Sequence, residues 1–317
     1  MRTSLKLSLL LASLVGIIAL FLLFEIDLSQ DYMIHKRSIR LASMLVVGVS
    51  VGFSSLVFQT LSQNRILTPA IMGYESIFIL FQTVIVFIYG DKTFQVITEQ
   101  NNFFYAVLLM MGFSLLMYLF MFRRSKLGML YLLLSGIVMG TLFQTFSQFM
   151  QILIDPNEFT VIQNFMFVSF SKMNTKLLSI ASITLLATLI YASFYIKYLD
   201  VIALGRDHAI NLGLNYQGLV RRFMLVISLL VSVSTALVGP ITFLGILVCN
   251  LTYELFPNRK HPAMLTVCCL ISCLCLVAGQ FLIEHIFQFS TTVSIVINFI
   301  GGLYFLYLLW STRKKIT

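Results

Sequence analysis

The sequence predicts an all-α protein that crosses a membrane about ten times. Hydrophobic residues make up 59% of its 317 residues, only 10% are charged, and the mean hydropathy is +0.96. A soluble domain carries about 25% charged residues. Long apolar segments recur between short polar ones, and about 20 apolar residues in a helix span the hydrocarbon core of a bilayer. We therefore expect one transmembrane domain over residues 1–317.

Ten segments are long and apolar enough to be spans. For the first, a cleaved signal peptide is the rival interpretation, but its apolar run is long and no small-x-small cleavage site follows Phe24. Two spans share residues 222–256, so Gly239-Pro240 is expected to break the helix and one of the two to be short and packed against protein. In chain order the expected spans are 5–24, 39–58, 71–89, 103–122, 128–150, 177–196, 222–239, 240–256, 263–283 and 291–310.

The basic residues favour a cytoplasmic location for both termini. With ten crossings and the N-terminus inside, 15 of the 21 Lys and Arg residues fall in inside segments, including those of 123–126 and of the tail 313–315. Cytoplasmic loops carry such an excess of Lys and Arg. The sequence therefore predicts a multi-pass protein of the cytoplasmic (inner) membrane.

Several classes of function are disfavoured. No G-x-x-x-x-G-K-[ST] loop is present to hold ATP, and the four His residues show neither metal-type spacing nor a catalytic constellation. The net charge of +9 does not indicate nucleic-acid binding, because no polar segment of the chain is long enough to form a water-facing basic surface. The five Cys residues fall inside expected spans without a His or an acid at that depth, so they are interpreted as packing residues.

Acidic residues are scarce within the expected spans. Glu75 lies four residues into the third, and Glu254 lies near a cytoplasmic end. Ion-coupled carriers commonly place charged residues near the middle of a span. If the chain is a transporter, its energy is therefore expected to come from a partner.

Three motifs follow one another along the chain. They are R-x-x-R at Arg37 and Arg40 with Gln59, Asn64, Pro69 and Gly73 after it, L-G-x-x-x-A-x-x-L-G from Leu204 to Gly213, and G-P-I-T-F-L-G from Gly239 to Gly245. In order, spacing and helix count the chain resembles the FecCD-type permeases of type II ABC importers, which include the cobalamin permease and many ferric-siderophore permeases. The resemblance covers nearly the whole chain and implies that fold.

Some positions depart from the family pattern. The family's N-P-L-A reads Asn64-Arg65-Ile66-Leu67, and its P-H reads Cys249-Asn250. Similar divergence is found among permeases that pair with a second, different permease for catecholate-type siderophores. The resemblance thus implies a second permease subunit, identical or different.

The resemblance implies that Arg37 and Arg40 dock an extracytoplasmic substrate-binding protein. On a helix the two lie on one side at the membrane surface, and a guanidinium forms bidentate bonds to carboxylates. Anchoring to phospholipid headgroups is the other interpretation. A third basic docking residue of the cobalamin permease has no counterpart, because its position is Ile283, followed by Glu284-His285.

Residues 197–222 resemble the cytoplasmic loop that fits a cleft of the ATPase in this family. Leu204, Ala209 and Leu212 are expected to offer a small apolar face, and Gly205 and Gly213 to allow tight turns. A plain connecting loop is the alternative.

Further residues are expected to shape or gate the core. Gln59, Asn64 and Pro69 are assigned to the turn between the second and third spans, and Glu75 beside Gly73 either lines the inner gate or pairs with buried amides. Gly239 and Gly245 belong to the third motif. In relatives the pathway runs along the fifth, eighth and tenth spans. Here these spans offer Gln144, Gln148, Asn250 and Asn298, although core packing explains the same residues.

The sequence is therefore interpreted as a permease subunit of an ATP-driven importer for ferric siderophores, of the catecholate type. The chain itself is expected to bind no cofactor, and ATP-Mg to act on partner ATPase subunits. An importer for cobalamin or haem is the alternative within the family. An ion-coupled secondary transporter is the alternative from another class.

Overall fold

The computed structural model describes residues 3–24, 31–119, 129–170, 173–257, 259–288 and 291–313, and all regular structure in these ranges is helical. The all-α class is thus confirmed. A helix lies at each of the ten expected spans. These helices are α1 (Thr3–Leu23), α2 (Asp31–Ser62), α3 (Tyr74–Tyr89), α5 (Glu99–Met117), α6 (Met129–Leu153), α8 (Thr175–Ser193), α11 (Tyr216–Val238), α12 (Leu244–Leu255), α13 (His261–His285) and α14 (Val293–Arg313).

Within the described ranges, six helices are long and apolar enough to cross a membrane, namely α1, α2, α5, α8, α11 and α13. Shorter apolar helices lie in α3, α12 and α14. The chain is therefore a multi-pass helical membrane protein, whereas the count of ten crossings stays a prediction. The expected span ends at 120–122 and at 128, and the basic residues at 2, 123–126 and 314–315, lie outside the described residues.

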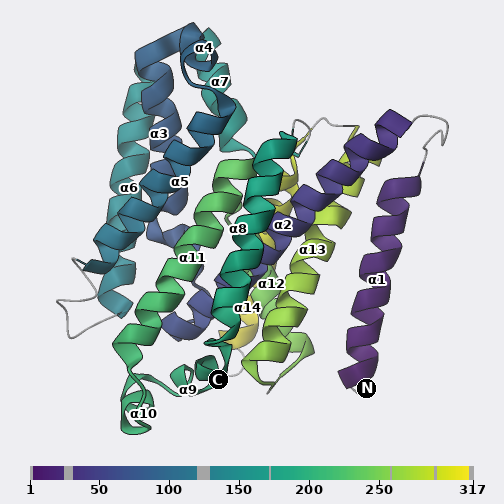
Figure 1. Ribbon diagram of the computed structural model, residues 1–317, viewed down its shortest axis with the longest axis vertical. Coiled ribbons are helices and arrows are strands. Elements are labelled where there is room, and N and C mark those ends of the chain that lie inside the picture. The colour runs from purple at the N-terminus through teal and green to yellow at the C-terminus, as the bar shows by residue number, and fades with distance from the viewer. Residues whose placement is uncertain are drawn as a thin grey trace.

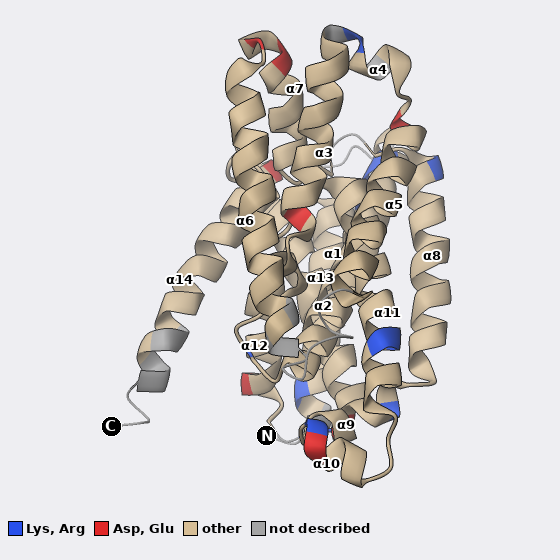
Figure 2. Ribbon diagram, turned by 90° about the vertical axis from the view of Figure 1, so that its left-hand side faces the viewer, with Lys and Arg blue, Asp and Glu red and all other residues tan. Residues whose placement is uncertain are grey.

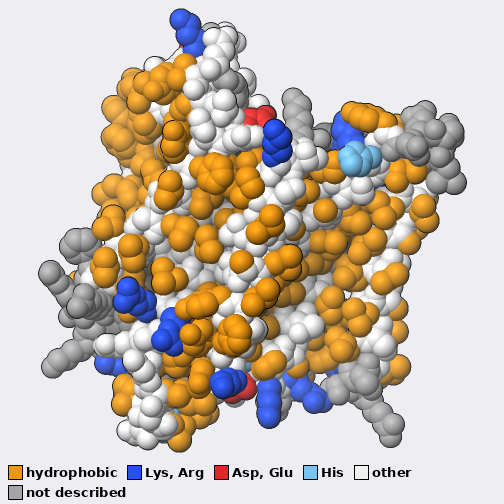
Figure 3. Space-filling model, viewed as in Figure 1, with side chains coloured by type: hydrophobic (Ala, Val, Ile, Leu, Met, Phe, Trp, Pro, Cys, Tyr) orange, Lys and Arg blue, Asp and Glu red, His pale blue; other side chains and the backbone are white. Residues whose placement is uncertain are grey.

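The helices form an elongated bundle (Figure 1). α1 flanks one side of it and packs on α13, while α3, α5 and α6 form the opposite side. α14 diverges from the bundle in the second view (Figure 2). Hydrophobic side chains cover most of the middle of the visible face, as a lipid-facing surface requires (Figure 3).

The predicted break at Gly239-Pro240 is confirmed. α11 ends at Val238 and is followed by Gly239 with φ +99° and ψ 178°, a conformation open essentially to Gly alone. A Cβ added there would also lie 3.2 Å from the carbonyl oxygen of Phe167. α12 has only 12 residues, and most of its first half is buried, as expected for the short partner of the pair. α11 begins at Tyr216, earlier than expected.

Several short helices connect the long ones. The 3₁₀ helix η1 (Pro69–Met72) precedes α3, and η2 (Gly90–Lys92) and α4 (Thr93–Val96) follow it. α7 (Pro156–Met166) was not expected, yet Asp155 caps it and Pro156 occupies its first turn, both common helix-start signals. The short helices of the 197–222 segment are η4 (Ile196–Tyr198), α9 (Leu199–Ile202) and α10 (Arg206–Asn211).

The centre of the bundle is the contact between α2 and α13. Gly52 lets the two backbones approach, because a Cβ added there would lie 3.0 Å from the carbonyl oxygen of Cys268. The thiol of Cys268 donates to the carbonyl of Gly52 at 3.3 Å, and that of Cys273 to the carbonyl of Leu45 at 3.7 Å. In lipid the hydrophobic effect does not hold helices together, and small residues at such crossings allow the close van der Waals packing that does. The cysteines are therefore packing residues here.

Candidate functional site

A groove of about 500 Å³ runs along α3, α6 and the start of α14. It is an open groove rather than an enclosed cavity, and its wall is rich in amides and hydroxyls. The polar lining residues are Glu75, Ser76, Thr141, Gln144, Ser147, Gln148, Gln151, Thr242, Ser294 and Asn298. Such a wall offers many weak hydrogen-bonding groups and one carboxyl group.

Three of the four residues expected along the pathway line this groove. Gln144 and Gln148 come from α6 and Asn298 from α14. Asn250 does not line it: its amide donates to the carbonyls of Arg65 at 3.1 Å and Ile246 at 2.9 Å. Asn250 therefore holds the turn after α2, and its assignment to the pathway finds no support.

Glu75 lies between the groove and a smaller cavity. The hydroxyl of Thr242 donates to Oε2 of Glu75 at 2.7 Å, so α3 is tied to the non-helical link between α11 and α12. Behind Glu75, a cavity of about 30 Å³ is lined by hydroxyl residues, among them Ser54 and Thr68. That volume suffices for water. The hydroxyl of Thr68 is buried and has no partner among the described residues.

The turn before the groove is built by the predicted residues. The amide of Gln59 donates to the carbonyl of Arg65 at 2.8 Å, and Oδ1 of Asn64 accepts from the backbone of Ile66 at 3.0 Å. Pro69 opens η1, where its fixed φ suits the first helical position. Gly73 ends η1 with φ +88°.

Gly73 and Gly245 permit close packing near the groove and the small cavity. A Cβ added at Gly73 would lie 3.1 Å from Cα of Gly140 in α6. One added at Gly245 would overlap Ser55 and lie 3.0 Å from a methyl carbon of Thr68. Both positions thus bring helices close together, and neither presents a side chain to a ligand.

The 197–222 segment, called the coupling segment below, lies at one end of the bundle (Figures 1 and 2). Leu204 is 60% exposed, Leu212 is 63% exposed, and Ile210 beside them is 48% exposed. Ala209, expected on this apolar face, is fully buried within the chain instead. Gly205 begins α10 with φ +107°, a conformation that L side chains rarely adopt; Gly213 follows the helix with φ +81°.

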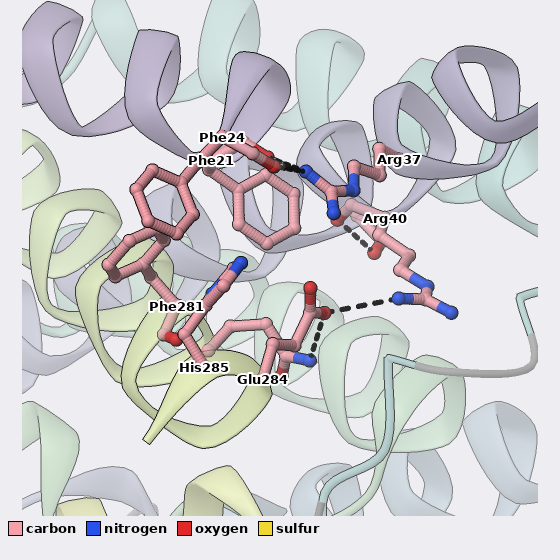
Figure 4. A network of polar contacts seen from close by, with 9 residues as sticks. Phe21, Phe24, Arg37, Arg40, Phe281, Glu284 and His285 are labelled. Atoms are coloured by element: carbon pink, nitrogen blue, oxygen red, sulfur yellow. Dashed lines mark hydrogen bonds and ion pairs between the residues drawn. The ribbon is translucent and has the colours of Figure 1, made fainter. Parts of the chain in front are cut away.

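Arg37 and Arg40 lie at the opposite end and are engaged within the chain (Figure 4). Nη1 of Arg37 donates to the carbonyls of Phe21 at 3.0 Å and Phe24 at 2.8 Å, at the end of α1, where helix carbonyls lack an intrahelical donor. Nη1 of Arg40 forms an ion pair with Oε1 of Glu284 at 3.1 Å. Sequence reasoning did not foresee the role of Glu284, because 244 positions separate it from Arg40.

The carboxylate of Glu284 is further fixed by its own helix. The amide of Gln280 donates to Oε1 of Glu284 at 2.7 Å. Beside it, the ring of His285 stacks on Phe281 with centroids 4.4 Å apart. The two arginines thus belong to a network of contacts between α1, α2 and α13.

The buried bundle, the open polar groove and the exposed apolar coupling segment together define a membrane permease. The chain belongs to the FecCD transport family, whose model matches residues 4–311. It is therefore a permease subunit of an ABC transporter, in which ATP is hydrolysed by separate subunits.

Three relatives show how the chain compares with named proteins. It is 46% identical over 315 residues to the petrobactin import system permease protein YclO of Bacillus subtilis, covering 99% of this chain and 100% of that protein. It is 31% identical to FatC of Bacillus anthracis, over 86% of this chain and 77% of that protein. FatD of the same organism is 24% identical, over 95% of this chain and 89% of that one. Both are described as petrobactin import system permease proteins.

Among solved structures, the fold is shared with a chain of a metal-chelate type ABC transporter in an inward-facing conformation. The TM-score is 0.84 at 21% identity, over 96% of this chain and 98% of that chain. PsaBC from Streptococcus pneumoniae gives a TM-score of 0.61 at 15% identity, over 94% of each chain.

Proposed function

We propose that this chain is a permease subunit of an ATP-driven importer for ferric siderophores of the catecholate type. The observation that carries the proposal is the 46% identity to a petrobactin import permease over nearly the whole of both chains. The polar groove supports it, because a conduit of amides and hydroxyls passes a bulky chelate without holding it tightly. Recognition is then left to a substrate-binding protein outside the membrane.

The groove is the part of the conduit that this chain supplies. Its open side is covered by a second permease subunit, so that the cargo passes between the two. The similarity of this chain to both FatC and FatD, two permease proteins of one import system, supports a pair of different subunits.

ATP-Mg acts on partner ATPase subunits, to which the coupling segment docks. The exposed side chains of Leu204, Ile210 and Leu212 support this, because apolar side chains on and beside the short helix α10 fit a groove on a partner. ATP closes the ATPase dimer, the coupling segment transmits that motion, and the conduit opens to one side of the membrane at a time.

The orientation that follows places the coupling segment in the cytoplasm. The start of α1 lies at the same end of the bundle as α9 and α10, which supports a cytoplasmic N-terminus (Figure 1). Arg37 and Arg40 then face the outside, where acids of the binding protein compete for their guanidinium groups. The protein belongs to the cytoplasmic membrane, with both termini inside and residues 1–317 as one domain.

Uptake of iron-labelled chelates tests the proposal. Catecholate, hydroxamate and citrate chelates are offered beside labelled cobalamin and haem to an iron-starved strain with and without the gene. Loss of catecholate uptake alone is the expected result. Loss of cobalamin or haem uptake alone, or of nothing, would overturn the siderophore assignment. Uptake that follows the proton gradient rather than ATP would favour an ion-coupled carrier.

A further inference from the structure

Hydrogen bonds that begin at Asp200 in α9 join the coupling segment to both central helices. Oδ1 of Asp200 accepts from the backbone N–H of His261 at 2.9 Å and lies 2.6 Å from its ring Nδ1. Because an ionised carboxylate only accepts, Nδ1 carries the proton in this contact. Nε2 of the same ring lies 3.0 Å from Oγ1 of Thr60 in α2. One imidazole therefore connects α9, α13 and α2.

The same carboxylate replaces a missing helix cap. Lys260 occupies the N-cap position of α13 and makes no side-chain capping bond. Asp200 supplies the acceptor from another element and places a negative charge at the positive end of the helix dipole. The start of α13 is thus held by the coupling segment and not by its own sequence.

The inner half of the link is shielded from water, whereas the side chain of Asp200 is 35% exposed. His261 is 9% exposed and Thr60 is 6% exposed. The hydroxyl of Thr60 also donates to the carbonyl of Leu56 at 2.9 Å, so it shares its one proton when it faces a neutral ring and accepts from Nε2 when the ring is protonated. Burial of Asp200 acts to raise its pKa, but the hydrogen bonds from the backbone and ring of His261 outweigh it and hold the pKa below the ordinary value. The carboxylate is therefore ionised at neutral pH.

α2 and α13, which His261 and Thr60 join at the coupling-segment end, are also joined at their opposite end. Arg40 of α2 pairs with Glu284 of α13 at 3.1 Å, and the side chain of Glu284 is only 6% exposed. Between the two ends, Gly48 and Gly52 bring the backbones into contact. α2 and α13 therefore form one unit that runs from the coupling segment to the docking arginines.

We propose that Asp200, His261 and Thr60 are positioning residues that make α2 and α13 follow the coupling segment when the ATPase moves it. The inference rests on the proposed function, since it needs an ATPase that docks on the coupling segment. It adds a route by which that movement reaches the membrane core and the outer end.

The test uses the complete complex, with ATPase subunits, second permease and binding protein, reconstituted into liposomes. ATP hydrolysis and transport of the iron chelate are measured together, and the readout is chelate moved per ATP. Asp200→Ala is expected to keep hydrolysis and to lower this ratio about tenfold, the effect of losing hydrogen bonds to a charged group. Asp200→Asn is expected to retain most of the wild-type ratio of chelate moved per ATP, because the amide oxygen still accepts from His261. An unchanged ratio in Asp200→Ala would overturn the proposal.

Two further variants separate linkage from simple stability. Thr60→Val keeps the volume and removes the contact with Nε2, so it should lower the ratio in the same direction; it decides the matter if Asp200→Ala does not assemble. Asn174→Ala removes the side chain that caps α8 through the backbone N–H of Lys176, so it should lower stability with the ratio unchanged. A wild-type complex that moves no chelate would refute the proposed function. A transporting wild-type complex with an unaffected Asp200→Ala would refute only this inference.

Discussion

Thr242 donates its hydroxyl to the carboxyl group of Glu75 at 2.7 Å, and this bond fixes the groove-side start of α3 to the link between α11 and α12. The contact settles which group Glu75 meets within the chain. It is a hydroxyl rather than the buried amide that one interpretation of the sequence expected.

Substitution of Glu75 distinguishes the bond from the charge. Glu75→Ala should lower chelate uptake about tenfold, because a buried hydrogen bond to a carboxyl group is lost. Glu75→Gln should keep most of the uptake, since its amide oxygen still accepts from Thr242. Uptake of the labelled chelate at equal membrane abundance measures both. An equal loss in the two variants would show that the charge itself is needed.

Bulk in the groove should block the cargo and leave the rest of the cycle intact. Gln148→Trp fills part of a groove of about 500 Å³ and should abolish uptake while ATP hydrolysis by the complex persists. Ile152→Trp is the matched control, because Ile152 lies on the same helix, does not line the groove and is 82% exposed. Equal uptake in wild type and Gln148→Trp would exclude this groove as the path.

Substitutions at two nearby positions of the coupling segment should cause different defects, one in ATPase binding and one in membrane abundance. Leu212→Arg changes an exposed side chain, so the chain should reach the membrane at normal abundance but no longer copurify with the ATPase. Ala209→Arg forces a charge into a fully buried position and should lower abundance itself. Quantitative immunoblots of membranes and of the purified complex separate the two. Normal copurification in Leu212→Arg would contradict docking through this face.

A charge swap tests the role of Arg40. Arg40→Glu places two carboxylates together at Glu284 and should lower both thermal stability and binding-protein affinity. Adding Glu284→Arg restores an ion pair and should recover stability without recovering affinity, if Arg40 serves docking. The measurements are the unfolding midpoint in detergent and the Kd of the binding protein. Recovery of both would assign Arg40 to internal structure alone.

Asp200 predicts a pH dependence of definite sign. Its pKa is lower in the folded chain than the ordinary 3.8, so its contribution to stability is present above about pH 4 and is lost as the pH falls through the folded value. The unfolding midpoint of wild type should exceed that of Asp200→Ala at neutral pH, and the gap should close below about pH 4. A gap that closes at pH 6 would contradict this assignment.

The sequence located the helices because length and hydropathy are local properties. It also located the break at Gly239, where the required conformation depends on one residue. It missed α7, whose 11 residues are too short and too polar to be read as a span, although Asp155-Pro156 is a start signal.

The site was predicted less fully because its contacts join distant parts of the chain. The burial of Ala209 is decided by tertiary packing and not by the spacing of the motif. Asn250 shares a span with the expected pathway but turns toward Arg65. The partners of Arg40 and Asp200 lie 244 and 61 positions away, and no pattern in one sequence reveals them.

A helix pair fastened at both ends is limited in how it deforms. Sliding α2 past α13 by one turn, about 5.4 Å, would break the contacts of Thr60 and of Arg40 together. Tilting the two helices together as one rigid body breaks neither the Thr60 contact nor the Arg40 contact. Any change of shape that opens the conduit should therefore leave the distance between these helices constant along their length, and the shear should fall on α14 and on the helices around the groove.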